Sequence, residues 1–85
     1  MIPDTPVSIV LESEMDDPSV LGRFSDEELL VADSRGRTVL HAAAHKGHAQ
    51  TLVALVEKFR GLIHKTDSLG NTPAHYAAGA PWESD

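Results

Sequence analysis

The stretch DSRGRTVLHAAA, residues 33–44, decides the fold of this 85-residue chain, because it returns as DSLGNTPAHYAA at residues 67–78. Over residues 33–46, seven of 14 positions are identical in the second copy. Unrelated sequences agree at only about one position in fifteen. The copies start at Asp33 and Asp67, and a fixed period in this range is typical of supersecondary units that stack on one another. The sequence therefore predicts a repeat protein.

Each copy combines a turn with the start of a helix. The D-S-x-G tetrapeptide favours a turn, because an Asp carboxylate accepts hydrogen bonds from the backbone that follows it and Gly tolerates a positive φ. Thr38 and Thr72 then stand where a helix begins and can cap its unpaired N–H groups. Pro73 follows at the first helical position, where its missing N–H costs least, and Gly47 ends the helix of the first copy.

A second, longer helix is expected over residues 50–59. Its apolar side chains recur at i, i+3, i+4 and i+7 and mark one face: Leu52, Leu55, Val56 and Phe59. Arg60 and Gly61 are typical of a helix end. The predicted unit is therefore a turn, a short helix, a second turn, a longer helix and a loop.

These motifs resemble the ankyrin repeat, which has the pattern D-x-x-G-x-T-P-L-H-x-A-A-x-x-G-H. The resemblance covers residues 33–80, about one and a half repeats. The residues that match the structural motif are Asp33, Gly36, Thr38, Leu40, His41 and Gly47 in the first copy and Asp67, Gly70, Thr72, Pro73 and His75 in the second. The chain departs from the pattern at Val39, which replaces Pro, at Ala74, which replaces Leu, and at one residue inserted around Arg60. None of these departures conflicts with the fold.

The resemblance implies an all-α fold, a short and incomplete ankyrin-type array of helix-turn-helix repeats. In this division of the chain, residues 33–66 form the full repeat, residues 67–80 the first half of the next, and residues 81–85 a tail. Residues 17–32 are expected to form a degenerate half-repeat, and residues 1–16 an acidic, mobile segment. Because about three repeats are needed for independent stability, we expect a weakly stable monomer or one stabilised by self-association.

Two interpretations of residues 17–32 stay open. Asp17 followed by Pro18 is typical of a capped helix start. Ser25 with Glu28 three residues later is instead the pattern of a capping box, which would open a short helix at that point. Either interpretation predicts short helices and loops in this segment.

Composition and motifs disfavour several classes of function. The chain has no cysteine, which removes disulfides and thiolate metal sites and favours a cytoplasmic or other intracellular location. No apolar run is long enough to span a membrane, and no signal peptide is visible, so we expect no membrane partner. The net charge of −6 disfavours nucleic acid as a partner. Known catalytic motifs are absent, so we expect neither an enzyme nor a cofactor.

Three histidines raise the question of a metal site. His41, His45 and His48 lie at i, i+4 and i+7, and on one continuous helix they would share a face suited to zinc. Gly47 should end that helix before His48. For His41 the ankyrin resemblance implies a structural hydrogen bond to the threonine and to the backbone of adjacent turns, and His75 has the same implied role. We therefore expect no metal site.

Because we expect neither catalysis nor a metal site, protein binding is the function expected of the chain. The resemblance implies that partner contacts come from turn tips and from the exposed side of the first helix of a repeat. The residues expected there are Ser34, Arg35, Arg37, His45, Lys46, Thr66, Ser68, Leu69 and Asn71. Leu69 is the most informative, because an apolar residue at a turn tip has no core to join. The alternative is a structural role as the end or a degenerate fragment of a longer ankyrin array.

Charge is distributed unevenly along the chain. Residues 1–34 hold nine acidic side chains and one basic side chain, whereas residues 35–85 hold six basic and four acidic ones. This asymmetry suggests that the acidic end docks on the chain's own basic face. On this hypothesis, deletion of residues 1–16 would strengthen binding to an acidic partner.

Overall fold

A computed structural model describes residues 5–82. Helical segments follow one another through this part of the chain: α1 (Pro6–Glu12), η1 (Pro18–Arg23), α2 (Asp26–Leu29), α3 (Val39–Lys46), α4 (Ala49–Lys58), η2 (Arg60–His64) and α5 (Pro73–Ala77), of which η1 and η2 are 3₁₀ helices. No strand occurs between residues 5 and 82, and the all-α prediction is confirmed. None of these helices has the length and apolar character that a membrane-crossing helix needs.

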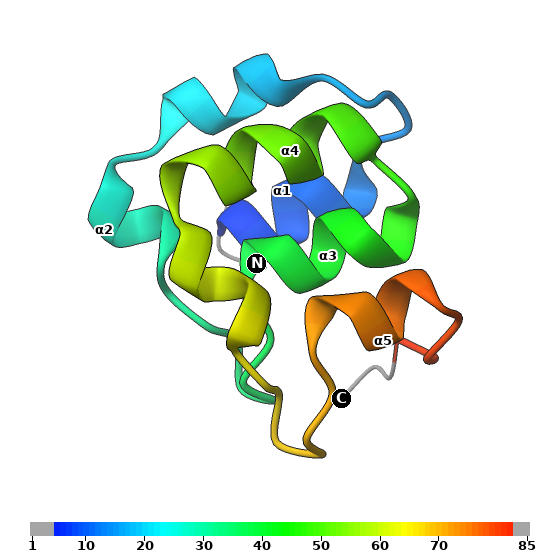
Figure 1. Ribbon diagram of the computed structural model, residues 1–85. Helices are drawn as coiled ribbons and strands as arrows, with labels where there is room; N and C mark the ends of the chain where they lie inside the picture. The colour runs from blue at the N-terminus through cyan, green and yellow to red at the C-terminus, as the bar shows by residue number, and fades with distance from the viewer. Residues whose placement is uncertain (1–4, 83–85) are drawn as a thin grey trace.

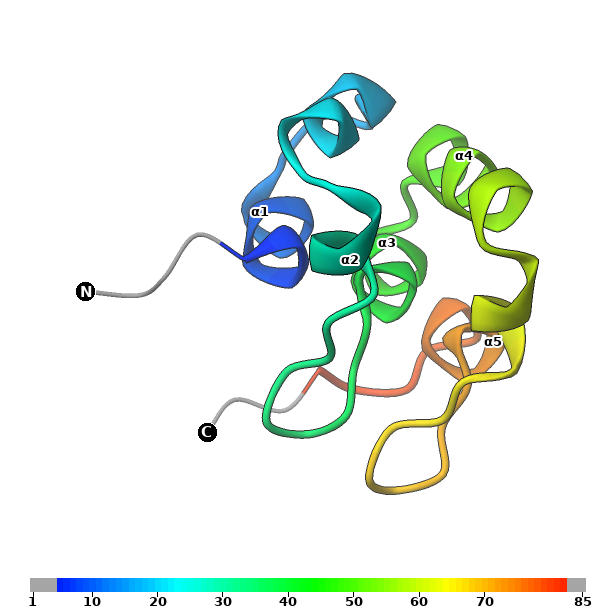
Figure 2. The same ribbon diagram turned by 90° about the vertical axis from the view of Figure 1, so that its left-hand side faces the viewer.

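The helices form two layers (Figure 1). In one layer α1, α3 and α5 lie in that order, with α3 in contact with both of the others. In the other layer α4 packs on α3, and η1 contacts both α1 and α4. The turns that precede α3 and α5 extend from the same edge of the array (Figure 2). This is the arrangement of stacked helix-turn-helix repeats.

The hydrophobic core lies around α3. Its buried members are Val7, Val10, Val39, Leu40, Ala42, Ala43, Leu55 and Leu62. Ala42 and Ala43 are fully buried, and their small side chains let the neighbouring helices approach α3 closely. Gly47 ends α3 with a φ of 72°, the left-handed conformation expected of a glycine at that position.

Helix α1 lies within residues 1–16, which were expected to form a mobile segment. Thr5 precedes it as the N-cap, and the Thr5 Oγ1 accepts a hydrogen bond of 3.2 Å from the Ser8 N–H. Val7 and Val10 are buried in the core, on the side of α1 that contacts α3. The physical reason is that apolar side chains three residues apart give this short helix one face to bury. Residues 1–4 lie outside the described part of the chain.

Helix α1 also continues the repeat toward the N-terminus. Thr5 is the N-cap of α1, as Thr38 is of α3 and Thr72 of α5. The spacing from Thr5 to Thr38 is shorter by one position than the spacing from Thr38 to Thr72. A comparison of the sequence with itself at the period of the two clear copies therefore misses this copy of the helix start.

Residues 17–32 contain both of the helix starts that the sequence left as alternatives. The Asp17 Oδ1 accepts a hydrogen bond of 3.0 Å from the Ser19 N–H and caps η1. Ser25 and Glu28 form the predicted capping box at the start of α2, with hydrogen bonds of 3.0 and 3.3 Å. The two short helices are consecutive, so the two interpretations do not exclude each other.

Candidate functional site

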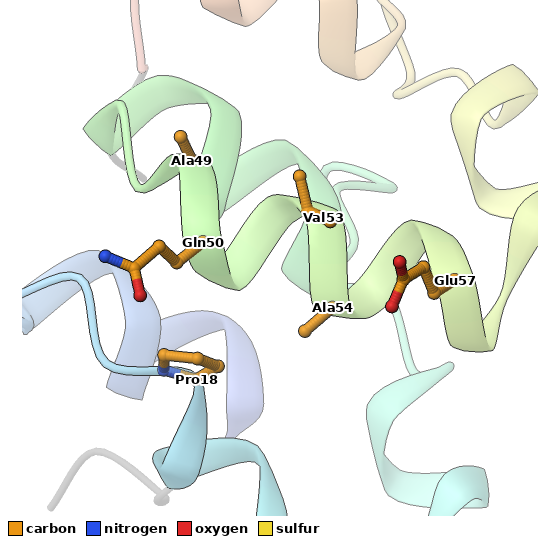
Figure 3. A pocket seen from close by; sticks show the side chains of 6 residues that line it. All are labelled: Pro18, Ala49, Gln50, Val53, Ala54 and Glu57. Atoms are coloured by element: carbon orange, nitrogen blue, oxygen red, sulfur yellow. The ribbon is translucent and has the colours of Figure 1, made fainter.

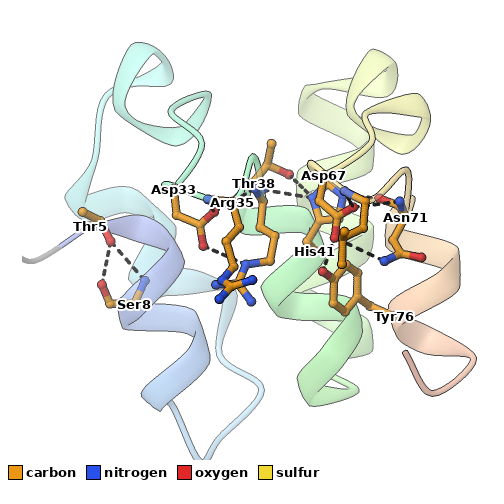
Figure 4. A network of polar contacts seen from close by, with 11 residues as sticks. Thr5, Ser8, Asp33, Arg35, Thr38, His41, Asp67, Asn71 and Tyr76 are labelled. Atoms are coloured by element: carbon orange, nitrogen blue, oxygen red, sulfur yellow. Dashed lines mark hydrogen bonds and ion pairs between the residues drawn. The ribbon is translucent and has the colours of Figure 1, made fainter. Parts of the chain in front are cut away.

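The turn before α3, residues 33–37, is organised by one carboxylate (Figure 4). The Asp33 Oδ1 accepts hydrogen bonds from the N–H groups of Arg35 and Arg37, at 2.9 and 2.8 Å. The Asp33 Oδ2 forms an ion pair with the Arg37 Nε at 2.8 Å. Gly36 reverses the chain with a φ of 76°. With its backbone and one side chain both held by Asp33, this turn forms a hairpin of fixed shape.

The turn before α5, residues 67–71, repeats this design. The Asp67 Oδ1 accepts hydrogen bonds from the N–H groups of Leu69 and Asn71, at 2.9 and 2.8 Å. The Tyr76 hydroxyl donates a further hydrogen bond to the Asp67 Oδ2. Burial opposes ionisation of this carboxyl, but the hydrogen bonds outweigh it and lower the pKa of Asp67 to about 2. Burial, together with the bond to Asp67, raises the pKa of Tyr76 to about 12.

The two hairpins are joined edge to edge. The Ser68 N–H donates a hydrogen bond of 2.8 Å to the Arg35 carbonyl oxygen. Gly36 lies at this junction, where a Cβ atom would meet the Ser68 nitrogen at 3.2 Å. The close approach and the positive φ both explain why glycine occupies this position. The hairpin tips therefore form one continuous surface.

His41 links the hairpins to the helices. Its Nδ1 accepts a hydrogen bond of 3.0 Å from the Thr38 N–H, and its Nε2 lies 3.1 Å from the Asn71 carbonyl oxygen. These partners assign the proton to Nε2, because Nδ1 must accept and a carbonyl can only accept. His75 forms the same Nδ1 contact with the Thr72 N–H, at 2.9 Å. His41 and His75 thus make the threonine contact that the ankyrin resemblance implies.

Acidification is expected to weaken the fold through His41. Burial lowers the pKa of His41 from 6.5, although the Asn71 carbonyl and the carboxylates of Asp67 and Asp33 act in the opposite direction. The unfolded chain therefore binds a proton more readily than the folded chain, so this stability is complete above about pH 6.5 and declines as the pH falls below that value. Thermal melts at pH 7.5 and pH 5.5 should give a lower midpoint at pH 5.5, and the difference should shrink in His41→Gln. Equal wild-type midpoints at the two pH values would contradict this assignment.

The other two histidines of the possible zinc face have separate surroundings. The His48 Nε2 lies 2.9 Å from the Ser13 carbonyl oxygen, on the N-terminal side of the array. His41 faces Asn71 on the C-terminal side, and His45 is exposed. Across residues 5–82, no three His, Cys, Asp or Glu side chains lie close enough together to hold a metal ion.

The side chains expected to contact a partner differ in exposure. Six of them are exposed: Ser34, His45, Lys46, Thr66, Ser68 and Leu69. Leu69 is 67% exposed at the tip of its hairpin. Arg35 and Asn71 are partly buried, and Arg37 is only 5% exposed. Arg37 therefore differs from the expectation of a solvent-facing contact residue, because Asp33 and an aromatic side chain hold it against the protein.

That aromatic side chain is Trp82, which the sequence analysis placed in an undistinguished tail. The Arg37 guanidinium carbon lies 3.8 Å from the centre of the indole. The ring of His45 lies 5.4 Å from the indole and that of Tyr76 lies 5.6 Å from it. The contacts join Trp82 to the first hairpin, α3 and α5, and no short-range sequence pattern indicates them.

Asp16 is a second residue that the sequence analysis did not single out. Its carboxylate oxygens accept hydrogen bonds from the N–H groups of Gln50 and Thr51, at 2.7 and 2.9 Å. The first turn of α4 thus receives its cap from a residue 34 positions earlier. Burial opposes ionisation of Asp16, but these hydrogen bonds outweigh it and lower its pKa. The sequence contained one signal of this contact. His48, the residue before α4, is a poor N-cap, so the first N–H groups of α4 need an acceptor from elsewhere in the chain.

Two depressions lie on other faces. One, of about 420 Å³, is an open hollow between η1 and α4, lined by Pro18, Ala49, Gln50, Val53, Ala54 and Glu57 (Figure 3). The other, of about 280 Å³, is an apolar groove between α4 and α5, and Leu52, Val56, Ile63 and Ala77 are among the residues that line it. Neither depression gathers the convergent polar side chains that a small-molecule site needs.

Comparison with known proteins agrees with this geometry. A family model described as ankyrin repeats, in three copies, matches residues 13–81. The mouse protein named "Ankyrin repeat domain-containing protein 63" is 37% identical over an alignment that covers 73% of this chain. The same alignment covers 17% of the mouse protein, so the chain spans a small part of that relative's length.

Proposed function

The chain belongs to the ankyrin repeat family, and from this premise we propose that it is a protein-binding module that acts without catalysis. It would contact its partner through the hairpin face, which we define as the tips of the two hairpins together with the exposed side of α3. Ankyrin repeats generally bind other proteins, and no feature of the fold described above supplies reactive groups arranged for chemistry.

The observation that carries this proposal is the rigid display of Leu69. The side chain is 67% exposed, yet Asp67 fixes the backbone on either side of it and Ser68 ties its hairpin to the preceding one. A surface that is ordered before binding loses little conformational entropy when a partner arrives. An apolar side chain held in this way is suited to fill a pocket on another protein.

The proposal is tested by comparing two double variants that remove equal charge from different faces. Leu69→Asn with Lys46→Gln alters the hairpin face, and Val53→Asn with Arg60→Gln alters exposed positions of α4 and η2. Proteins captured by the wild-type chain and identified by cross-linking should bind the first variant at least about tenfold more weakly. They should bind the second variant as they bind wild type. The reverse pattern would show that the partner binds the exposed surface of α4 and η2.

A second candidate function is stacking within a longer ankyrin array, and the apolar groove between α4 and α5 favours it. Helix α4 packs on α3 and is the second helix of the same repeat. Across residues 5–82, no second helix covers α5, and the groove beside it is lined by apolar side chains. The second helix of a further repeat would fit there. In the same capture experiment this candidate predicts that Ile63→Glu, within the groove, abolishes association and that the hairpin variant does not.

A further inference from the structure

The hairpin face already holds one side chain in the manner of a ligand. Trp82 lies where the first hairpin, α3 and α5 meet, and its indole is in contact with Arg37, His45 and Tyr76. The Arg37 guanidinium lies over the ring at 3.8 Å, the geometry of a cation–π interaction. The rings of His45 and Tyr76 are tilted by 38° and 54° to the indole, so neither ring stacks flat on it. We call these three residues the indole site.

Each wall of the indole site is supported by the fold independently of Trp82. Arg37 is held by its ion pair with Asp33 at 2.8 Å. The Tyr76 hydroxyl is anchored on Asp67, and the ring of Tyr76 packs edge-on against His41 at 5.4 Å. His45 belongs to the last turn of α3. The site is therefore ordered before an aromatic ring binds, and the side chain of Trp82 is one occupant of it.

The surroundings of the indole site favour acidic residues next to that ring. Lys46 and Arg37 lie close enough to His45 to act on its ionisation: burial lowers the pKa of His45, and these two cations lower it further. Arg37 is paired with the carboxylate of Asp33, so the exposed Lys46 supplies the positive charge beside the site. The chain's own sequence complements this charge, because Trp82 is followed by Glu, Ser and Asp. A tryptophan with carboxylates beside it thus matches both the aromatic contacts of the site and the charge of Lys46.

We propose that the indole site is a recognition pocket for a protein segment that carries a tryptophan beside acidic residues, and that Trp82 occupies it as an internal competitor. This inference rests on the proposed function, because it names the class of partner that the hairpin face binds. A short tether gives the tail an effective concentration in the millimolar range. An external segment must displace Trp82 from the site, so Trp82 raises the concentration of partner that is needed for binding.

The test uses a labelled peptide with the chain's own sequence Ala-Pro-Trp-Glu-Ser-Asp and measures its fluorescence anisotropy. Trp82→Ala, which empties the site, should bind this peptide at least about tenfold more tightly than the wild-type chain does. A peptide with Ala in place of Trp should not bind. A peptide with Gln and Asn in place of Glu and Asp should bind more weakly at low salt and no differently from the acidic peptide at high salt. Equal affinity of the wild-type and Trp82→Ala chains would overturn the internal competition, and equal affinity of the Trp and Ala peptides would overturn the aromatic pocket.

The matched control adds a second substitution to Trp82→Ala. His45→Ala removes a wall of the indole site at an exposed position and should abolish the gain, whereas Val53→Ala on α4 should preserve it. Circular dichroism establishes that each variant is folded before affinities are compared. If His45→Ala left peptide affinity unchanged, the site would be wrongly located.

The wild-type chain gives a second readout that does not depend on any variant. Trp82 is its single tryptophan, so excitation at the red edge of the protein absorbance reports on this residue alone. A peptide with Phe in place of Trp should displace the indole at millimolar concentration, shifting its emission to the red and increasing its quenching by acrylamide. Unchanged emission at saturating peptide would overturn the proposal. If the hairpin variants lose their partners while these peptide tests fail, the proposed function stands and only the indole site falls.

Discussion

Deletion of residues 1–16 is expected to abolish the cooperative unfolding of the chain. The deletion removes α1, in which Val7 and Val10 are 5% and 2% exposed, and burial of each such side chain contributes about 1.5–3 kcal/mol. It also removes Asp16, which caps α4. The total folding stability of a small domain is only about 5–15 kcal/mol, so a loss of several kcal/mol leaves little folded protein. Far-ultraviolet circular dichroism and a thermal melt of the truncated chain would measure the effect.

The control separates packing from charge. Glu12→Gln with Glu14→Gln removes two exposed acidic charges and leaves α1 in place, so this variant should melt as the wild-type chain does. The charge asymmetry of the sequence suggested the opposite use of this segment, as an acidic cover that could be removed to strengthen binding. A sharp melt for the truncated chain would restore that hypothesis.

Leu55→Ala should have the second large effect. Leu55 is 0% exposed and joins α4 to the core around α3, and truncation of such a residue costs about 2–5 kcal/mol because it loses contacts and leaves a cavity. In a chain of 85 residues this is a large fraction of the total stability. Urea denaturation of the two chains would measure the difference in free energy of unfolding.

The matched control for this substitution lies on the same helix. Val53 is 55% exposed, and Val53→Ala should change stability by less than about 0.5 kcal/mol, since alanine also has the better helix propensity. Equal losses for Leu55→Ala and Val53→Ala would mean that the face of α4 assigned to the core is wrong.

The sequence predicted the parts of the fold that depend on residues close together in the chain. The D-S-x-G turns, the threonine caps and the apolar face of α4 each depend on residues a few positions apart, and the structure shows all of them. Helix α1 was missed because Pro3 stands where the two clear copies have Gly36 and Gly70, and because its distance from the next copy is one position shorter than the period of those copies. The apolar face of the helix, which packing requires, is retained, whereas the glycine by which the turn is recognised is replaced.

The candidate site was predictable only in outline. The hairpin tips follow from the turn motif, and Leu69 is exposed as expected. Arg37 is less exposed than expected, because a pattern that places a cation at a turn does not reveal that a tryptophan 45 positions later packs on it. The cap that Asp16 provides to α4 is non-local in the same sense. Such contacts arise from how the repeats stack, and no property of either residue alone indicates them.

The hydrogen bonds of Asp16 make the opening of α4 depend on the preceding repeat. In an independent helix the first amides have no intrahelical acceptor, so they exchange with solvent at almost no cost in free energy. Here the amides of Gln50 and Thr51 are bound to a carboxylate that α1 and η1 hold in place, so they are released when that N-terminal unit moves away. Slow hydrogen exchange at the start of α4 would then report the sub-global unfolding of residues far earlier in the chain, and neighbouring repeats would open as one cooperative unit.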